Sequence, residues 1–428
     1  MPRAGHAGIM IEAPKGTRDI LPDEIGRWQL AEECARETFD RYAFREIRTP
    51  IFESTELFTR GIGEGSDIVA KEMYTFHDRK GRSVTLRPEN TAPVARAFIE
   101  HQMHRAPGLQ RLYYIGPMFR YERPQKGRMR QFHQIGVEVF GSEHPAVDAE
   151  TLEMLMAFLG RLGLGDAELA LNSVGDPVCR PVYRKALLAY LEPHRNTMCD
   201  DCQRRMTENP LRCFDCKVEA DRAVMATAPT ITDYLCAPCQ EHFGRVTGYL
   251  RAYGIRHRIE PRLVRGLDYY RRTSFEVTLQ GLGAQNALLG GGRYDGLLRE
   301  LGGPDVPGFG FAVGEERLVM SLPAAAAVSR GTHEVFIAAV GEDGVERALL
   351  VARALRRVGR RVVFDPLPDK SLKAQLRRAN DLQARFVLIL GETEVRERAV
   401  TIKKMLDGSQ ETIAEDRVGA RLAEMASA

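Results

Sequence analysis

No apolar run in this 428-residue sequence approaches the roughly eighteen residues that a membrane-spanning helix needs. The first ten residues also lack the apolar core of a signal peptide. We therefore predict a protein that does not enter a membrane and that resides in the cytoplasm.

Charge of one sign is not in excess either, since the net charge is only +3 although 28% of the residues are charged. This weak basic balance permits a nucleic-acid partner without requiring one, because only clustered charge produces a strong local field. A chain of 428 residues that is 44% hydrophobic is long enough for two or three domains with sizeable cores.

Cysteine is nearly absent outside one segment: seven of the eight lie between Cys179 and Cys239, most of them in C-x-x-C pairs. In a cytosolic chain such pairs indicate metal binding or reduced thiols more than a disulfide framework. The phosphate-loop pattern GxxxxGK[ST] is absent, so the glycines Gly290–Gly292 are only a weak indication of a phosphate loop.

The most informative stretch is Tyr113–Gly141, YYIGPMFRYERPQKGRMRQFHQIGVEVFG. Apolar residues alternate in Tyr113–Phe119 and in Phe132–Phe140, which predicts two strands, while Pro124–Arg130 can continue neither. The loop and its flanks hold the cations that phosphate oxygens require: Arg120, Arg123, Lys126, Arg128 and Arg130.

On the return strand of this hairpin, Gln134 and Glu138 are four residues apart and should share one face. By composition alone, a solvated basic hairpin with two exposed polar residues is the simpler interpretation. The order of residues favours a different one, given below.

Upstream, apolar residues at helical spacing predict a helix over Asp23–Tyr42, followed by a strand over Phe44–Thr49. Glu89 and Thr91 follow a second predicted hairpin, at the start of a helix, where a carboxylate and a hydroxyl can hold an ammonium group. Helix capping is the alternative role for these two residues.

Downstream, Pro261–Val277 (PRLVRGLDYYRRTSFEV) suggests a strand from Leu263 onward with a bulge at Gly266. Gly308–Gly314 predicts a strand and glycine turn leading into a helix that contains Arg317. From Glu334 apolar strands alternate with helices, which indicates a small α/β domain with parallel strands.

The hairpin FRYERPQKGRMRQFHQIGVEVFG resembles motif 2 of class II aminoacyl-tRNA synthetases, and in detail the histidyl-tRNA synthetase form. The helix and strand ending at Pro50 resemble motif 1, the segment around Arg317 resembles motif 3, and RGLDYY resembles the histidine-recognition motif. The resemblance extends over essentially the whole chain. The family usually has LRPEGT where this chain has LRPENT, so Asn90 replaces a glycine.

The resemblance implies an α+β catalytic domain over residues 1–325, with a six-stranded antiparallel sheet flanked by helices and a helical insertion at about 176–260. It also implies a linker at 326–330 and a C-terminal α/β anticodon-binding domain at 331–428. In that domain Arg356, Arg357, Arg360, Arg361, Lys373, Arg377 and Arg378 are candidates for phosphate contacts, although charged helix faces are usually only solvated.

The same resemblance implies a homodimer that binds L-histidine, ATP with Mg²⁺, and tRNA(His), and that joins histidine to the tRNA. The implied catalytic cations are Arg120 and Arg265. The implied ATP contacts are Arg120, Glu122, Arg128 and Arg317. The implied histidine contacts are Glu89, Asn90, Thr91, Arg120, Gln134, Glu138, Arg265, Tyr269 and Tyr270. Arg123 and Gln125 are candidates for the tRNA acceptor end.

For the cysteine-rich insertion we predict at most a structural Zn²⁺, with Cys199, Cys202, Cys236 and Cys239 as its ligands, because two C-x-x-C pairs suffice for one tetrahedral site. Free thiols are the equal alternative. Catalysis should not depend on this metal.

Three other hypotheses remain. A non-catalytic paralogue of the family binds histidine as a regulatory subunit of histidine biosynthesis, but it typically lacks the C-terminal domain and the catalytic arginines. A class II synthetase for another amino acid is disfavoured by RGLDYY. A zinc-dependent nucleic-acid-binding module would explain the cysteines alone.

Overall fold

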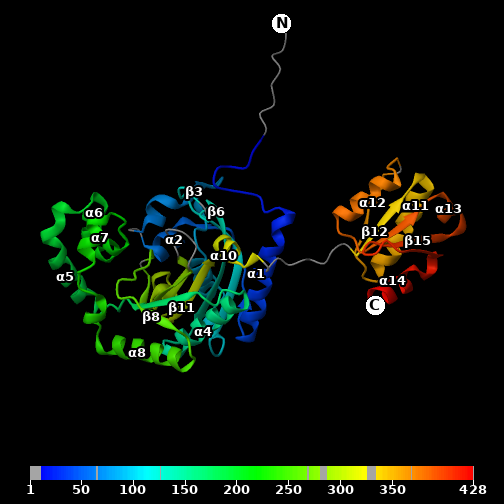
Figure 1. Cartoon of the computed structure of the whole chain (residues 1–428). Coiled ribbons are helices and arrows are strands. Elements are labelled where there is room, and N and C mark those ends of the chain that lie inside the picture. Colours follow the sequence, from blue (N-terminus) through cyan, green and yellow to red (C-terminus); the bar gives the residue numbers. More distant parts are fainter. Residues whose placement is uncertain are drawn as a thin grey trace, which may run out of the picture. The chain divides into compact units, whose positions relative to one another are not determined.

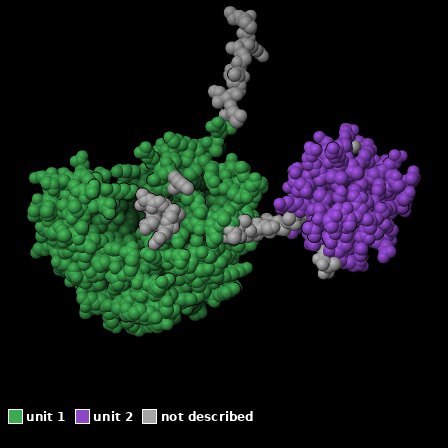
Figure 2. All heavy atoms as spheres, viewed as in Figure 1, with its two compact units in different colours: residues 1–327 green, residues 328–428 purple. Residues whose placement is uncertain are grey.

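The computed structural model describes residues 11–63, 66–125, 127–267, 269–279, 287–324, 334–367 and 369–427. It forms two compact units, Met1–Ala327 and Val328–Ala428, which are coloured separately in Figure 2. The linker predicted at 326–330 lies outside the described residues. Within the described ranges, no helix is long and apolar enough to cross a membrane.

The first unit is built on an eight-stranded sheet with the order β1-β5-β6-β11-β10-β9-β7-β8. Its strands are β1 (Arg45–Glu46), β5 (Gln110–Phe119), β6 (Gln131–Phe140), β7 (Glu168–Ser173), β8 (His257–Ile259), β9 (Arg271–Thr278), β10 (Ala287–Arg293) and β11 (Gly308–Gly314). The six strands from β5 to β7 pair antiparallel, as predicted. At each edge a further strand, β1 or β8, pairs parallel with its neighbour. The strand predicted over Phe44–Thr49 contains β1, whereas β8 was missed by the sequence analysis.

One face of this sheet packs on helices α1 (Pro22–Arg41), α4 (Pro145–Arg161), α8 (Ala237–Ala252) and α10 (Glu315–Ser321). Helix α1 forms because its buried residues, among them Trp28, Ala31, Ala35 and Phe39, recur every three or four positions. On the sheet side the same core contains Ile135, Val137 and Val139 of β6. These helices are visible around the sheet in Figure 1.

The opposite face of the sheet is covered by α3 (Thr91–Glu100) and α9 (Leu297–Glu300) together with a layer of buried tyrosines. Beside α3 lie α2 (Thr55–Ile62) and a three-stranded sheet of β2 (Phe52–Ser54), β3 (Tyr74–His77) and β4 (Ser83–Leu86). Gln134 and Glu138 of β6 and Glu276 of β9 also point to this face, which makes it the side on which a functional site can form.

The insertion between β7 and β8 is helical, as predicted, and has a core of its own that includes seven of the eight cysteines among its buried and partly buried members. Its helices are α5 (Arg180–Leu191), α6 (Asp200–Glu208), α7 (Glu219–Met225) and the long α8, joined by short 3₁₀ turns. Figure 1 shows α5, α6 and α7 gathered to one side of the sheet.

The second unit has a five-stranded sheet with the order β13-β12-β14-β15-β16. Its elements are β12 (Val335–Ala339), α11 (Gly341–Arg357), β13 (Val362–Phe364), α12 (Leu372–Asp381), β14 (Phe386–Leu390), α13 (Glu392–Glu397), β15 (Ala399–Lys404), β16 (Gln410–Ala414) and α14 (Val418–Ser427). Strands β13, β12 and β14 are parallel, as predicted, whereas β15 and β16 add an antiparallel edge.

One local prediction is wrong. The strand predicted from Leu263 begins only at Arg271, because Pro261–Leu267 forms turns that leave the sheet. The glycines Gly290–Gly292 are not a loop but the middle of β10, where side chains and backbone from neighbouring strands come too close for a Cβ atom.

Candidate active site

A cavity of about 660 Å³ opens on the tyrosine face of the sheet, and six of the residues predicted for substrates line it: Arg120, Glu122, Arg128, Gln134, Arg265 and Arg317. Seven cationic and six anionic side chains line it in total. The cations are Arg120, Arg128, Arg205, Arg212, Lys217, Arg265 and Arg317, and the anions are Asp67, Glu72, Glu122, Asp215, Glu276 and Glu316. Mixed charge of this kind suits a phosphate-rich ligand together with a divalent cation.

Arg120 follows the end of β5, where its N–H group donates to the carbonyl of Arg130 across the hairpin at 2.8 Å. Its guanidinium lies over the ring of Phe132 at 5.2 Å, and its Nε donates to the carbonyl of Pro88 at 2.8 Å. The guanidinium is therefore held by two separate segments, which pre-organises it toward the cavity.

Within the basic loop, Arg128 pairs with Glu122 at 3.1 Å, and the backbones of Gln125 and Arg128 bond to each other in a tight turn. Arg123 and Gln125, the candidates for the tRNA acceptor end, are both exposed at this tip. The predicted cation Lys126 lies outside the described residues.

Arg265 reaches the cavity from the turns that precede β9. Its Nη1 donates to Glu276 Oε2 at 2.6 Å, and its guanidinium covers Gly290, where a Cβ atom would stand 2.4 Å from the guanidinium carbon. Gly290 and Glu276 are paired across β10 and β9. Only glycine at position 290 leaves room for this arginine without displacing it.

Arg317 lies in the first turn of α10, which β6 holds in place because the N–H group of His133 donates to the carboxylate of Glu316 at 2.9 Å. Arg317 Nη1 donates to the carbonyl of Ala287 at 2.6 Å. Burial, together with the positive charge of Arg128, lowers the pKa of Arg317 from its ordinary value.

A second, more deeply buried group adjoins the cavity and consists of Glu89, Thr91, Glu138, Tyr269 and Tyr270, each at most 8% exposed. Glu138 Oε1 accepts from the hydroxyl of Thr91 at 2.7 Å, and the rings of Tyr269 and Tyr270 lie 4.8 Å apart. The structure therefore brings together these five residues predicted to contact the amino acid, although they come from three separate stretches of sequence.

Tyr294 and Tyr114 also belong to this group and were missed by the sequence analysis. The hydroxyls of both donate to Glu138, and the rings of Tyr294 and Tyr269 are 5.7 Å apart. Tyr114 alternates with outward-facing residues along β5, so its position on the inner face could have been predicted from the sequence. Nothing in the sequence around Tyr294 distinguishes it from a core tyrosine.

Burial raises the pKa of Glu138 to about 8, against the opposing hydrogen bonds from Tyr294, Thr91 and Tyr114. Burial likewise raises the pKa of Glu89, although its carboxylate accepts the N–H groups of Ala92 and Thr91. Ionising these two buried acids costs free energy because they are shielded from water. A cationic or N–H-bearing ligand would offset this cost by stabilising the ionised forms.

Asn90 has an ordinary backbone conformation (φ −120°), so the replacement of glycine by asparagine causes no strain at this position. Its side-chain oxygen accepts from Thr49 at 2.7 Å and from Arg87 at 3.2 Å. The side chain thus joins two segments beneath the site. Gln134 Oε1, by contrast, is buried with no hydrogen-bond partner among the described residues.

The predicted zinc ligands do not meet in one place. Cys236 and Cys239 cluster with Asp176 and Cys179, whereas Cys199 and Cys202 cluster with Cys216 and Asp221. The prediction of one site from Cys199, Cys202, Cys236 and Cys239 is therefore wrong, because the fold of the insertion places these two C-x-x-C pairs in two separate clusters.

An antiparallel six-strand core with a basic hairpin, a buried acid–tyrosine group and an arginine at the start of α10 defines the catalytic domain of a class II aminoacyl-tRNA synthetase. Residues 16–318 match the family model described as histidyl-tRNA synthetase, and residues 334–425 match the model of an anticodon-binding domain. The chain belongs to the histidyl-tRNA synthetase family.

Curated relatives agree with this assignment. The chain is 52% identical over 414 residues to a histidine–tRNA ligase of Solibacter usitatus, covering 96% of this chain and 99% of that one. It is 51% identical over 408 residues to a histidine–tRNA ligase of Moorella thermoacetica, covering 95% and 96%. The crystal structure of apo histidyl-tRNA synthetase from S. aureus aligns with a TM-score of 0.80 at 38% identity, covering 96% of this chain and all of that one.

Proposed function

We propose that this protein is a histidine–tRNA ligase. It activates L-histidine with ATP to give histidyl-adenylate and pyrophosphate, and then transfers histidine to the 3′ end of tRNA(His) for protein synthesis. The observation that supports this most directly is the convergence of Arg120, Arg265 and Arg317 on one cavity beside the buried Glu138 group.

In the first step the carboxylate of histidine attacks the α-phosphate of ATP and pyrophosphate leaves. Negative charge accumulates on the α-phosphate, so cations fixed before the reaction lower the barrier. We assign this role to Arg120 and Arg265, and the distal phosphates to Arg317. Glu122 and Arg128 would hold the rest of the nucleotide.

ATP would bind together with Mg²⁺, which would neutralise part of the charge on the phosphates. Glu122 and Glu276 are the cavity carboxylates that could contact the ion, as Mg²⁺ prefers oxygen ligands. Each is paired with an arginine, at 3.1 and 2.6 Å respectively. Binding of the metal complex would therefore redistribute these ion pairs.

For the amino acid we assign the ammonium group to Glu89 and Thr91, with Asn90 supporting them from below and Gln134 offering its unpaired oxygen. Glu138, Tyr269 and Tyr270 would face the imidazole. Analogues without either ring nitrogen would leave buried polar groups unpaired, which gives selectivity without editing.

In the second step the ribose hydroxyl at the 3′ end of the tRNA attacks the adenylate. Arg123 and Gln125 are our candidates for the acceptor end, because both are exposed at the tip of the basic hairpin. The C-terminal unit would bind the anticodon region. Arg357, Arg361, Lys373 and Arg377 are exposed there and could contact phosphates, whereas Arg360 forms an ion pair with Glu334.

We also propose a cytoplasmic homodimer, on the basis of the motif 1 segment formed by α1 and β1. Sedimentation velocity on the purified protein tests the dimer.

The decisive experiment is histidine-dependent ATP–pyrophosphate exchange, followed by charging of tRNA with labelled histidine. For Arg265→Ala we expect exchange to fall by about 100- to 1000-fold, the usual cost of removing one pre-organised stabilising group. The matched control is Arg258→Ala on β8, an arginine paired with Glu260 outside the cavity, which should retain activity. Histidine binding without any exchange in the wild type would instead support the regulatory-subunit hypothesis.

A further inference from the structure

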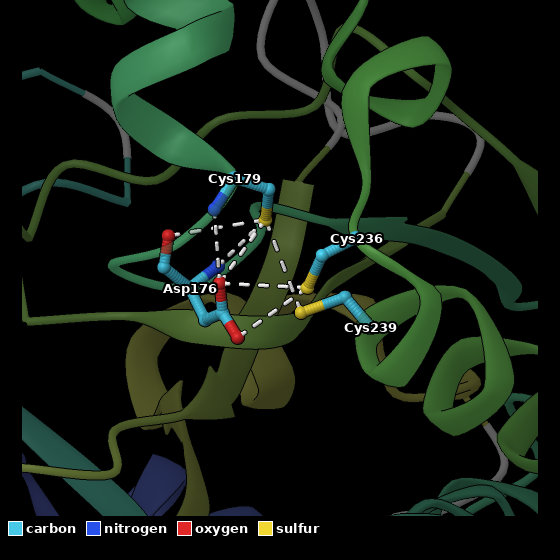
Figure 3. Close-up of side chains that lie close together, drawn as sticks. All are labelled: Asp176, Cys179, Cys236 and Cys239. Carbon is cyan, nitrogen blue, oxygen red and sulfur yellow. Dashed lines mark hydrogen bonds between the residues drawn. The ribbon is translucent and has the colours of Figure 1, made fainter.

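Four side chains converge where the start of the insertion, after β7, meets the start of α8 (Figure 3). Asp176 and Cys179 lie between β7 and α5, Cys236 precedes α8, and Cys239 lies in its first turn. One potential ligand atom from each lies within 4.8 Å of all the others. Asp176 and Cys179 are thus brought to cysteines 60 positions further along the chain.

The distances within this group match those of a tetrahedral zinc site. With zinc–sulfur bonds of about 2.3 Å and zinc–oxygen bonds of about 2.0 Å, the tetrahedral angle places two sulfurs about 3.8 Å apart and a sulfur and an oxygen about 3.5 Å apart. The structure has 3.9 Å between the sulfurs of Cys179 and Cys239, and 3.6 Å between Cys236 Sγ and Asp176 Oδ2.

The carboxylate of Asp176 is held in an orientation suited to this role. Its Oδ1 accepts the N–H groups of Val178 at 2.9 Å and Cys179 at 3.1 Å, which fixes the group. The thiol of Cys179 lies 3.3 Å from Oδ1, and that of Cys236 lies 3.6 Å from Oδ2. Metal-binding carboxylates are commonly oriented by such secondary hydrogen bonds. Simple packing of buried thiols would not require a carboxylate aimed into their midst.

We propose that Asp176, Cys179, Cys236 and Cys239 bind one Zn²⁺ ion. Cys179 and Cys239 are 3% and 0% exposed, so all four positions of the ion would be filled by protein and none left for substrate. A closed site of this kind is structural. The ion joins the start of the insertion to the start of α8.

A second cluster independently meets the same criteria. Cys199, Cys202, Cys216 and Asp221 also place one potential ligand atom each within 4.8 Å of the others. The sulfurs of Cys199 and Cys216 are 3.8 Å apart, and Cys216 Sγ is 3.2 Å from Asp221 Oδ2. We propose that this cluster, located within the insertion, binds a second Zn²⁺ ion.

The second ion would have a direct connection to the active site. Asp215 and Lys217 flank Cys216 and line the cavity, and Arg212 reaches from the same segment to Asp67 at 3.4 Å. Zinc at this cluster fixes the backbone that presents these side chains. The insertion would thereby keep a charged wall of the cavity in place.

The test is the zinc content of the full-length protein, incubated with Zn²⁺, freed of excess metal by gel filtration and measured by mass spectrometry. We expect two ions per chain in the wild type, one in Cys236→Ser and one in Cys199→Ser. The matched control is Cys34→Ala, a buried cysteine of α1 outside both clusters, which should retain two.

Wild-type protein without zinc after this treatment overturns both sites. A single ion that is lost only in Cys199→Ser overturns the site at Asp176, and a single ion lost only in Cys236→Ser overturns the other. If either serine variant fails to fold, the wild type is loaded with Co²⁺ in place of Zn²⁺. We expect thiolate-to-cobalt charge-transfer bands with an intensity that corresponds to two ions per chain. The absence of these bands overturns the proposal.

Asp176→Asn separates ligation from packing, because asparagine can still accept the two N–H groups but offers no negative charge. We expect this variant to fold and to lose zinc to a chelator at least about tenfold faster than the wild type. Equal rates would show that Asp176 is not a ligand.

Discussion

At the scale of single residues, the position of Arg265 depends on the missing side chain of Gly290. We predict that Gly290→Ala displaces this guanidinium, because the new Cβ would lie 2.4 Å from its central carbon. Pyrophosphate exchange should fall by roughly 10- to 100-fold, as misplacing a catalytic group by about 1 Å does. The melting temperature should change little, since the group that must move is the end of a flexible side chain.

Gly244→Ala in α8 is the matched control for this prediction, because nothing lies within 4 Å of the added Cβ atom. It should leave exchange unchanged and stabilise the helix slightly. Exchange at the wild-type rate in Gly290→Ala would contradict the role given to Arg265.

Glu315 is a second residue with a testable consequence. It is 1% exposed, and neither carboxylate oxygen has a hydrogen-bond partner among the described residues. Burial, followed by the charges of Glu32 and Glu316, raises its pKa from 4.5 to about 9. The unfolded chain therefore releases this proton at lower pH than the folded protein does, so the group reduces stability progressively as the pH rises from about 4.5 to about 9.

Glu315→Gln removes this titration. We predict a free energy of unfolding higher by roughly 1–3 kcal/mol at pH 8 and nearly unchanged at pH 4.5, measured by urea denaturation. Glu342→Gln, in the exposed first turn of α11, is the control and should show no such pH-dependent gain. If Glu315→Gln changed the free energy of unfolding by the same amount at every pH, the pKa of Glu315 would not be raised in the folded protein.

At the scale of elements, strands with strict alternation could be predicted closely. Strands β5 and β6 differ from their predicted bounds by three residues or fewer, since one face of each is apolar. The conformation of the segment around Arg265 could not be predicted in this way. Its apolar residues lie in turns, and its backbone does not pair with the sheet. The local sequence does not indicate which distant strands a turn-rich segment will contact.

The cysteines show the same limit. Their spacing indicates C-x-x-C pairs that can bind metal, but it does not indicate which pairs lie close together in the fold. Helices separate the pairs, and the packing of these helices determines which cysteines become neighbours. The acids of the two clusters, Asp176 and Asp221, have no sequence signal at all. Among the catalytic candidates, residues within recognisable segments were found, whereas Tyr294 and Glu276 were identified only through contacts made by the fold.

A prediction at this scale concerns the insertion. A cross-link that closes a loop of about 60 residues stabilises a protein by about 4 kcal/mol in the chain-entropy model, and a metal clip acts in the same way. We therefore expect a strong chelator to lower the unfolding temperature of the wild type by several degrees, measured by calorimetry. Cys236→Ser should start from the lower value and respond less.

At the scale of the whole molecule, the two units have separate hydrophobic cores. A protein ending at residue 324 should therefore fold and retain histidine-dependent exchange, since every cavity residue lies in the first unit. Charging of tRNA should fall by about 100-fold, the equivalent of nearly 3 kcal/mol of lost tRNA contacts. Equal losses in both assays would show instead that the first unit does not fold alone.

The two faces of β6 have one more consequence. Ile135, Val137 and Val139 enter the core, while Gln134 and Glu138 point into the site from the opposite face. A slip of one residue in pairing would exchange the two sets and bury the polar ones among the helices. Any molecule in which this sheet has formed with a buried apolar face therefore also presents Gln134 and Glu138 on the side of the site. The fraction of competent molecules in any preparation should equal the fraction folded, so a burst titration of bound adenylate would also serve as a count of native protein.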